Sequence, residues 1–569
     1  MEKPAGQLEI MPKVFLFLSL TGLFYSIFLE LPGFSYSHSM KSDQNQDSSE
    51  YSQFENWQDL YITENQYKID VLHYDFSIAL DYPSKTIEAV SQISILVTEP
   101  IESLDLNFFG NMKIGHLTIN GELTEYQKSG TVISIECKAK AGDTIYFKIS
   151  YSGKPLNSGD GSFTWQGFNG AKVISTLGEP NLNPSWFICN DRPDDKATLE
   201  MRITNDSTFT SVSNGSLVSV VSQGSKKTYH WRSTYPISTY LIALYSGQYE
   251  RFEDKYISVT GDSIPLEYYV VPSKRKAAES EFSRHALMFE FMYQSVGEYP
   301  FKKEKYGVAG FNWQGGAMEN QTITGVGHSL IGNSAGMETT YLHELAHHWF
   351  GNSVGPKTWR DIWLNEGFAT YFEGLYLVHT GQIRAISEYM NGLRREKFRG
   401  SMYNPEYDDI FSRAVYDKGA WVLHSLRYEI GDSLFFRTLR NYYERFKYSN
   451  ASTQDFQYIC ETVSGRDLRK FFNQYVYYGN EIPVVRYNYV TEKHGEAYLT
   501  LVSFEQENVT EPYQITFDLT LRGRDSSHVE RITLNERAEL KRFRTDFHPG
   551  KLIPDENGSF IGFIIPITN

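Results

Sequence analysis

This chain contains few cysteines and has no excess of positive charge. Three widely spaced cysteines in 569 residues form neither a disulfide framework nor a cysteine-ligated zinc site. The net charge of −15 argues against nucleic acid as a partner, because no basic field neutralises phosphates. Hydrophobic residues make up 41% of the chain and aromatic residues 15%, which indicates a globular protein. Its length is too great for one core, so several domains are expected.

Long apolar runs are also rare, and the one that occurs is near the amino terminus. Val14 to Leu29 is a sixteen-residue uncharged run that follows Lys13 and precedes Glu30. It is short for a membrane span of about 20 residues and resembles the core of a signal peptide. Residues 1–37 are therefore expected to be a cleaved signal. An uncleaved anchor attached to the membrane through residues 14–29, or a buried helix, is the alternative. A signal or an anchor would export the chain, either secreted or held at the outer face of the cell membrane.

Patterning along the chain predicts an α+β multidomain protein. Residues 38–58 are polar and read as a linker. Alternation such as Ile87, Ala89, Ser91, Ile93 predicts an antiparallel β domain over residues 59–254. Helical periodicity then dominates residues 255–480, which are expected to form the catalytic unit. Alternation returns at Ile515, Phe517 and Leu519, and predicts a small β-sandwich over residues 481–569.

The most informative segment runs from His343 to His347 and reads His-Glu-Leu-Ala-His. On a helix, positions i and i+4 share one face, so both imidazoles can bind a single cation. Glu344 is offset around the helix and could reach a water bound to that cation without being a ligand. Hydrophobic periodicity predicts a helix from Met337 to Phe350 around this motif. An amphipathic helix with two polar residues at helical spacing is the alternative for the motif alone.

A third ligand strengthens the prediction of a metal site. Glu366 follows His347 after an eighteen-residue spacer, in the first turns of a second helix expected from about Asp361 to His379. Two nitrogens and a carboxylate oxygen suit zinc, and three protein ligands leave the fourth position for water. His343, His347 and Glu366 therefore predict one catalytic zinc ion per chain and a hydrolase. The neighbouring His348 points elsewhere on the helix and is expected to be structural.

Further motifs give the chain a family resemblance. Over residues 60 to 569, the sequence resembles the zinc aminopeptidases of the aminopeptidase N and leukotriene hydrolase family. The resemblance rests on the zinc motif and on segments around it and in the β domain, namely Gly315 to Asn320, Trp363 to Ala369, Val415 to Ala420, Trp186 to Pro193, Ser213 to Gly215, and Pro236 to Leu241. It implies a thermolysin-like fold for the α-rich catalytic domain.

The resemblance also implies roles for individual residues. It makes Glu344 the general base and Tyr416 the donor that stabilises the oxyanion. Glu319 would bind the free α-ammonium of a peptide, with Glu179 as a second amine-binding carboxylate. The backbone around Gly316 and Ala317 would lie along the peptide, and Met318 is expected to pack near the substrate. Without the resemblance, Tyr416 would read as a packing residue and Glu319 as a cap of a glycine-rich turn.

Together these features predict an aminopeptidase acting on peptides with a free amino terminus. A zinc endopeptidase of thermolysin type is an alternative, because it shares the zinc pattern. A non-catalytic relative that only binds peptides is another, although every ligand and both catalytic groups are present here. A leukotriene-type epoxide hydrolase is disfavoured, because that enzyme has a neutral amide where Glu179 stands. The preferred amino-terminal residue and the oligomeric state do not follow from the sequence.

Two departures from the family pattern accompany the resemblance. The chain is expected to be a short member that lacks the large C-terminal helical domain common in relatives, so its active site should be more open or closed by another subunit. At Leu177, many relatives have a glutamine that contacts substrate. Ile188 also replaces the usual proline of its motif, which is expected to change structure only.

Overall fold

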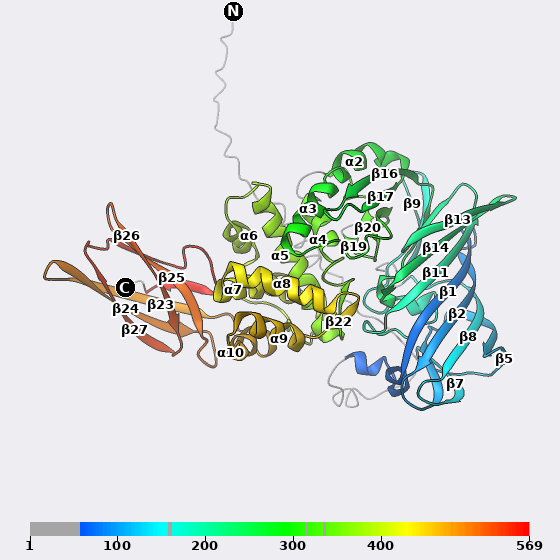
Figure 1. Ribbon diagram of the computed structural model, residues 1–569, viewed down its shortest axis with the longest axis horizontal. Helices are drawn as coiled ribbons and strands as arrows, with labels where there is room; N and C mark the ends of the chain where they lie inside the picture. Colours follow the sequence, from blue (N-terminus) through cyan, green and yellow to red (C-terminus); the bar gives the residue numbers. More distant parts are fainter. Residues whose placement is uncertain (1–56, 158–161, 314–315, 334–336, 480, 568–569) are drawn as a thin grey trace, which may run out of the picture. The chain divides into compact units, whose positions relative to one another are not determined.

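The computed structural model describes residues 57–157, 162–313, 316–333, 337–479 and 481–567 (Figure 1). The expected signal or anchor, and all but the last two residues of the expected linker, lie outside these residues and stay predictions. Within the described ranges, no helix is both long enough and apolar enough to cross a membrane.

The amino-terminal domain is built on an eight-stranded sheet in the order β13-β14-β11-β1-β2-β8-β4-β5. The sheet is antiparallel, as predicted, except that β1 and β11 run parallel. These two strands are separated in sequence by residues 82–196, which is ample chain for the crossover that a parallel pair requires. The strands are β1 (Ile69–Asp81), β2 (Thr86–Val97), β4 (Met112–Ile119), β5 (Glu122–Leu123), β8 (Thr144–Gly153), β11 (Ala197–Asp206), β13 (Ser216–Gln223) and β14 (Lys226–Ile237).

Two smaller sheets complete this domain. One has the order β3-β7-β6, with β3 (Ile101–Asn107), β6 (Gln127–Ser129) and β7 (Val132–Ala139). The other has the order β12-β15-β10-β9, with β9 (Phe163–Phe168), β10 (Ala171–Thr176), β12 (Thr210–Ser213) and β15 (Leu244–Gly247). The predicted alternation is confirmed in β2, where Ile87, Ala89, Ser91 and Ile93 are all buried.

The α-rich region also contains a sheet, which the sequence did not predict. Its order is β16-β17-β18-β20-β19, with β17, β18 and β20 parallel. The expected domain boundary between residues 254 and 255 falls inside β16, the first strand of this sheet. The strands are β16 (Glu250–Ile257), β17 (Ser263–Val270), β18 (Tyr306–Phe311), β19 (Ala317–Met318) and β20 (Ile323–Gly327).

In sequence, two helices lie between β17 and β18, and the others follow β20. The helices are α2 (Arg275–Phe282), α3 (His285–Ser295), α4 (Met337–Ala346), α5 (Trp363–His379), α6 (Ile386–Leu393), α7 (Gly419–Ile430), α8 (Asp432–Phe446), α9 (Thr453–Ser464) and α10 (Arg469–Phe472). Short π-helices, η9 (Ala414–Lys418) and η10 (Asn473–Tyr477), precede α7 and follow α10. Strands β21 (Val354–Pro356) and β22 (Ser449–Ala451) pair with each other.

The carboxy-terminal domain consists of two small sheets, as predicted. Their orders are β27-β24-β23-β29 and β26-β25-β28. Ile515, Phe517 and Leu519 are buried along β25, which confirms the alternation there. The strands are β23 (Val484–His494), β24 (Ala497–Glu507), β25 (Ile515–Arg522), β26 (Ser527–Leu534), β27 (Ala538–Thr545), β28 (Lys551–Pro554) and β29 (Phe563–Pro566).

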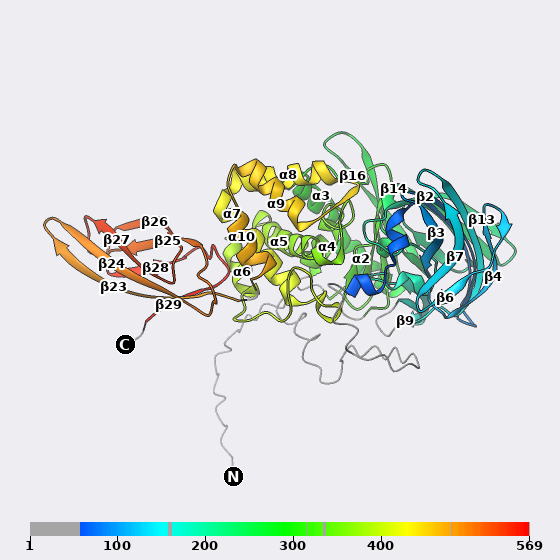
Figure 2. The ribbon, with the colours of Figure 1, turned by 90° about the horizontal axis from the view of Figure 1, so that it is seen from below.

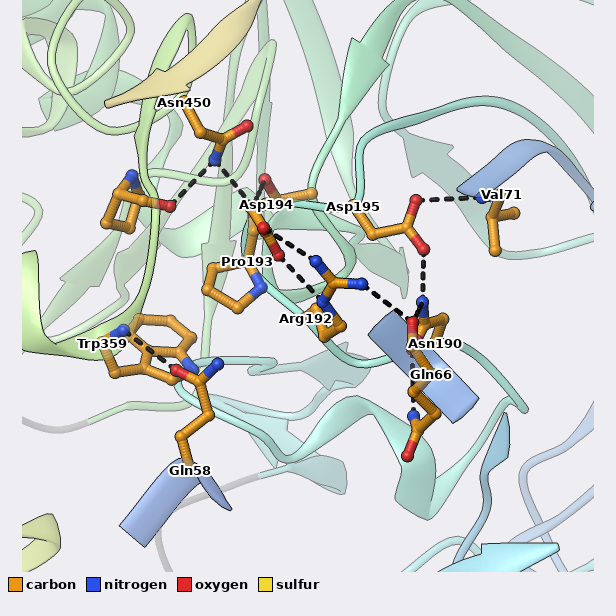
Figure 3. A network of polar contacts seen from close by, with 12 residues as sticks. Gln58, Gln66, Val71, Asn190, Arg192, Pro193, Asp194, Asp195, Trp359 and Asn450 are labelled. Atoms are coloured by element: carbon orange, nitrogen blue, oxygen red, sulfur yellow. Dashed lines mark hydrogen bonds and ion pairs between the residues drawn. The ribbon is translucent and has the colours of Figure 1, made fainter. Parts of the chain in front are cut away.

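Polar contacts join the β domain to the helical region (Figure 3). Asn450 donates both to Pro193 O and to Pro356 O, each at 2.9 Å. The Trp359 N–H donates to Gln58 Oε1 at 3.1 Å. Half-buried Lys196 donates to Asn352 O, 2.7 Å away, and to two further carbonyls. Pro193 and Lys196 thus take part in the contacts that hold the two domains together.

Candidate metal and substrate site

Helix α4 and the turn that directly follows it carry the first two candidate ligands on one face. Leu342, Leu345 and Ala346 are fully buried, which fixes the rotation of the helix and directs the histidines to the other side. Helix α4 ends at Ala346, four residues before the predicted end, but the His347 N–H still donates to His343 O at 3.2 Å. The two imidazole centroids are therefore only 4.7 Å apart.

Glu366 reaches the same point from the first turn of α5. Its Oε2 lies 3.3 Å from His343 Nε2 and 3.4 Å from His347 Nε2. Between the two helices the chain reverses at Gly351, whose φ of +133° favours glycine. The structure thus brings together all three residues that the sequence predicts as ligands, and all three are buried.

The outer nitrogens of both imidazoles have acceptor partners. His343 Nδ1 is 2.9 Å from Glu373 Oε1, and His347 Nδ1 is 3.2 Å from Phe350 O. With the protons on Nδ1, both Nε2 lone pairs point at the Glu366 carboxylate. Three acceptors at such distances repel one another unless positive charge lies between them. This donor set fits zinc.

The electrostatics agree that the triad attracts positive charge. Burial lowers the pKa of His343, but hydrogen bonds to Glu366 and Glu373 outweigh it and raise this pKa well above its ordinary value. Burial raises the pKa of Glu366, yet the two histidines, His347 foremost, lower it to about 2. A proton on an imidazole supplies the charge when no metal is bound.

Glu344 lies beside the triad without contributing to it. It is buried, and its Oε2 has no hydrogen-bond partner among the described residues. Burial, above all, raises its pKa to about 8. A carboxylate in this state takes up a proton readily, and a nearby cation would lower its pKa again.

Two more carboxylates gather next to Glu366. Oxygens of Glu179, Glu319 and Glu366 all lie within 4.8 Å of one another. Glu179 follows β10 of the amino-terminal domain, and Glu319 follows β19. One buried oxygen of each has no partner within the described part of the chain. Burial raises the pKa of both, and for Glu179 repulsion from Glu319 adds to it.

Residues 316–318 directly precede Glu319 of this cluster in sequence. Ala317 and Met318 make up β19, where they pair with Val326 and Gly325. Met318 is buried, whereas Gly316 and Ala317 are half-buried. A side chain at Gly316 would collide with the Trp313 ring, because its Cβ would lie 2.4 Å from a ring carbon. This close approach requires glycine.

Tyr416 belongs to the π-helix η9, which leads directly into α7. Its ring lies 6.1 Å from that of His343, nearly parallel to it. The following turn packs tightly on α5, because a Cβ on Gly367 would lie 2.9 Å from Gly419 Cα. This contact joins two of the family motifs and holds Tyr416 near the triad. Short π-helical insertions are frequent at functional sites.

The structure adds residues that the sequence reasoning missed. Glu373 stands seven positions after Glu366, two helical turns along the same face, and this spacing could have revealed it. Asn352 donates from Nδ2 to Glu319 O at 2.6 Å. His348 is buried, accepts from the Thr322 N–H at 3.1 Å and contacts Glu344 O at 3.1 Å, which agrees with its expected structural role.

Comparison with known families gives this arrangement a context. The model of the peptidase M1 N-terminal domain matches residues 70–241, and that of the peptidase family M1 domain matches residues 281–475. The chain belongs to peptidase family M1. The resemblance to zinc aminopeptidases is thereby confirmed, and the two family domains follow one another along this M1 chain.

Individual relatives are distant. Endoplasmic reticulum aminopeptidase 1 of Rattus norvegicus is 25% identical over 447 residues, covering 71% of this chain and 47% of the relative. Aminopeptidase M1 of Arabidopsis thaliana is 29% identical over 333 residues, covering 54% of this chain and 37% of the relative. The chain thus spans about half the length, or less, of such curated relatives.

Solved structures confirm the M1 fold. Aminopeptidase A of Legionella pneumophila aligns with a TM-score of 0.78 at 18% identity, covering 88% of this chain and 60% of that one. An M1 zinc metallopeptidase of Deinococcus radiodurans aligns with a TM-score of 0.64 at 24% identity, covering 72% of this chain and 93% of that one.

Proposed function

We propose that this M1 protein is a zinc-dependent aminopeptidase that hydrolyses amino-terminal residues from peptides. The observation that carries the proposal is the position of Glu179 and Glu319. Their carboxylates lie within 4.8 Å of Glu366, beside the ligand triad, and each has a buried oxygen without a partner in the described structure. Buried acids without partners attract a cation, and a free α-ammonium supplies one.

His343, His347 and Glu366 would hold one zinc ion. Bound there, zinc would supply Lewis acidity and lower the pKa of water in its fourth position to about 7. The partners of Nδ1, Glu373 and Phe350 O, keep both imidazoles in the tautomer that presents Nε2 to the metal.

Glu344 would act as the general base. Its free Oε2 is available to take the proton from the attacking water and to return it to the leaving amine. Tyr416 would donate its hydroxyl proton in a hydrogen bond to the developing oxyanion. Such a donor stabilises the transition state more than the ground state, because the oxygen gains charge as the carbonyl is attacked.

Glu319 and Glu179 would hold the α-ammonium and so select the end of the peptide. With the amine fixed, the first peptide bond is the one that lies over the metal. An acylated amino terminus has no charge to offer, and binding it would leave two carboxylates unpaired in a buried site. The backbone at Gly316 and Ala317 would run beside the peptide, with Met318 packing near its first residue.

A panel of aminoacyl fluorogenic substrates tests the proposal directly. Free aminoacyl substrates should be hydrolysed, and a chelator should abolish the activity until zinc is added back. Matched N-acetylated substrates should be cut far more slowly, by about 100-fold or more, because they lack the charge that the two carboxylates bind. Equal rates on free and acetylated substrates would indicate an endopeptidase, and binding without turnover would indicate a non-catalytic relative.

A further inference from the structure

Strand β13 ends the eight-stranded sheet and has a free hydrogen-bonding edge. Among the described residues it pairs only with β14 (Figures 1 and 2). Four of its eight residues are apolar and well exposed, namely Leu217, Val218, Val220 and Val221, at 41%, 47%, 45% and 58%. A free edge with exposed Val and Leu is a template for pairing with another strand.

Exposed apolar side chains of β13 lie on both faces of the sheet. Val220 lies opposite Tyr229, and Val221 lies opposite Thr228, so neighbouring valines point to opposite faces of the sheet. The register shifts between Leu217 and Ser219, which leaves Val218 as a bulge at one end. The regular part of the edge is therefore Ser219 to Gln223.

The other eight-residue edge strands of the described sheets differ from β13 in charge. Strand β16 carries five charged side chains, β27 carries four, and β26 carries two. Strand β13, with the sequence Ser-Leu-Val-Ser-Val-Val-Ser-Gln, carries none. Charged side chains keep an exposed edge from pairing, because pairing would bury them. Among these long edges within the described part of the chain, β13 alone has no such protection.

We propose that β13 is a dimerisation edge, on which β13 of a second copy of this chain pairs antiparallel about a two-fold axis. A neutral strand meets its own copy without like-charge repulsion, and a two-fold axis at Val221 places the two copies of this exposed valine opposite each other on one face. A charged partner strand would instead bury its charges against valine.

The symmetry of the pairing makes such an assembly closed. The opposite side of the sheet is bordered by β5, which has two residues and pairs, in the described structure, only with Thr118 and Ile119 of β4. Growth through β13 stops at two copies, because a two-fold pairing uses the same strand of both copies. One eight-residue strand from each copy makes a small interface, for which a dissociation constant of roughly micromolar order is expected.

Light scattering after size-exclusion chromatography of the full chain tests this proposal. From about 1 to 100 µM, the measured mass should rise from that of the 65.5 kDa chain towards twice that value. The Val221→Lys variant should remain monomeric, with unchanged melting temperature and peptidase activity, because Val221 is exposed and lies on a different strand from every candidate site residue.

A matched control is available at Leu540 on β27. It is 56% exposed on an edge strand that is already charged, so Leu540→Lys should dimerise like the wild type. Hydrogen exchange adds a local measurement, since those amides of Ser219 to Gln223 that point away from β14 should become protected as concentration rises. A wild-type monomer throughout, a dimeric Val221→Lys variant, or species larger than dimers would each overturn the proposal.

Discussion

His343 Nδ1 lies 2.9 Å from Glu373 Oε1, in a contact that is almost wholly buried. Both residues face inward from packed helices, α4 and α5. Glu373 therefore does for His343 what the Phe350 carbonyl does for His347. A carboxylate on the outer nitrogen fixes the ring and makes its other nitrogen a better ligand.

Replacing Glu373 tests this positioning role. Glu373→Leu should weaken zinc binding by about 10- to 100-fold, because the His343 ring loses its partner. Glu373→Gln keeps an acceptor and should lose less. Competition with a chelator measures zinc affinity, and the melting temperature of the metal-free protein separates this effect from a loss of stability. Unchanged zinc affinity in Glu373→Leu would make Glu373 a packing residue.

Replacing Glu344 separates catalysis from metal binding. Glu344→Gln should retain one zinc ion per chain and lose nearly all turnover, since an amide cannot take a proton from water. Metal analysis and steady-state rates check both halves of this prediction. If the variant kept wild-type activity, another group would have to be the base.

Removing the Tyr416 hydroxyl tests its proposed contact with the oxyanion. Tyr416→Phe should lower kcat by about 10²- to 10³-fold with little change in KM, because the hydrogen bond forms mainly in the transition state. The ring itself stays, so its packing near His343 is retained. A change confined to KM would place Tyr416 in substrate binding.

The amine-binding proposal predicts a selective effect at Glu319. Glu319→Gln should lower kcat/KM on free aminoacyl substrates by at least about tenfold, since a charge-assisted hydrogen bond is lost. The small residual activity on N-acetylated substrates should fall much less. Rates on the matched substrate pair measure the difference, and equal losses on both would remove Glu319 from amine recognition.

Buried histidines away from the metal predict the acid sensitivity of the fold. Burial, first of all, lowers the pKa of His285 and His328 to about 3 and that of His424 to about 4, from an ordinary 6.5. Below pH 6.5 the unfolded chain takes up protons that the folded chain refuses. The contribution of these three histidines to stability should therefore be fully present above about pH 6.5 and fall between about pH 6.5 and about 4 by roughly 1.4 kcal/mol per histidine per pH unit. Buried acids with raised pKa values, such as Asp191 and Asp195, act in the opposite direction.

Melting temperature against pH measures this loss of stability. His328→Leu should flatten the decline, because His328 has no hydrogen-bond partner among the described residues and its removal deletes one of the titrating groups. His494, which is exposed, provides the matched control, and His494→Gln should leave the decline unchanged. Identical slopes in all three proteins would refute this explanation.

The zinc helices could be predicted from the sequence because their signals are local. The spacing of His343 and His347 and the following Glu366 required only helical periodicity, and α5 ends at His379, as expected. The predicted end of the first zinc helix is less accurate, because α4 ends at Ala346 and not at Phe350. Boundaries of this kind depend on packing against neighbours.

The five-stranded sheet could not be predicted, because two of its strands, β18 and β20, lack the alternation of an exposed sheet. All residues of β18 and β20 are buried, so neither strand has a polar face. The π-helical turn at Tyr416 likewise depends on the approach of Gly419 to Gly367, two positions far apart in sequence. Glu179 and Glu319 come from different domains and meet only where the two domains are in contact. The family resemblance implied that these two carboxylates act together, whereas hydrophobic periodicity gave no sign of it.

The contact of Asn352 with the Glu319 backbone ties the amine-binding cluster to the turn that follows His347. Under the proposed function, the group that binds the ammonium and the groups that bind the metal are thus connected through this turn. The protein therefore sets the distance between the bound ammonium and the scissile carbonyl. A β-amino acid at the amino terminus lengthens that span by one carbon–carbon bond, about 1.5 Å. Peptides that begin with a β-amino acid would then bind as competitors while escaping hydrolysis.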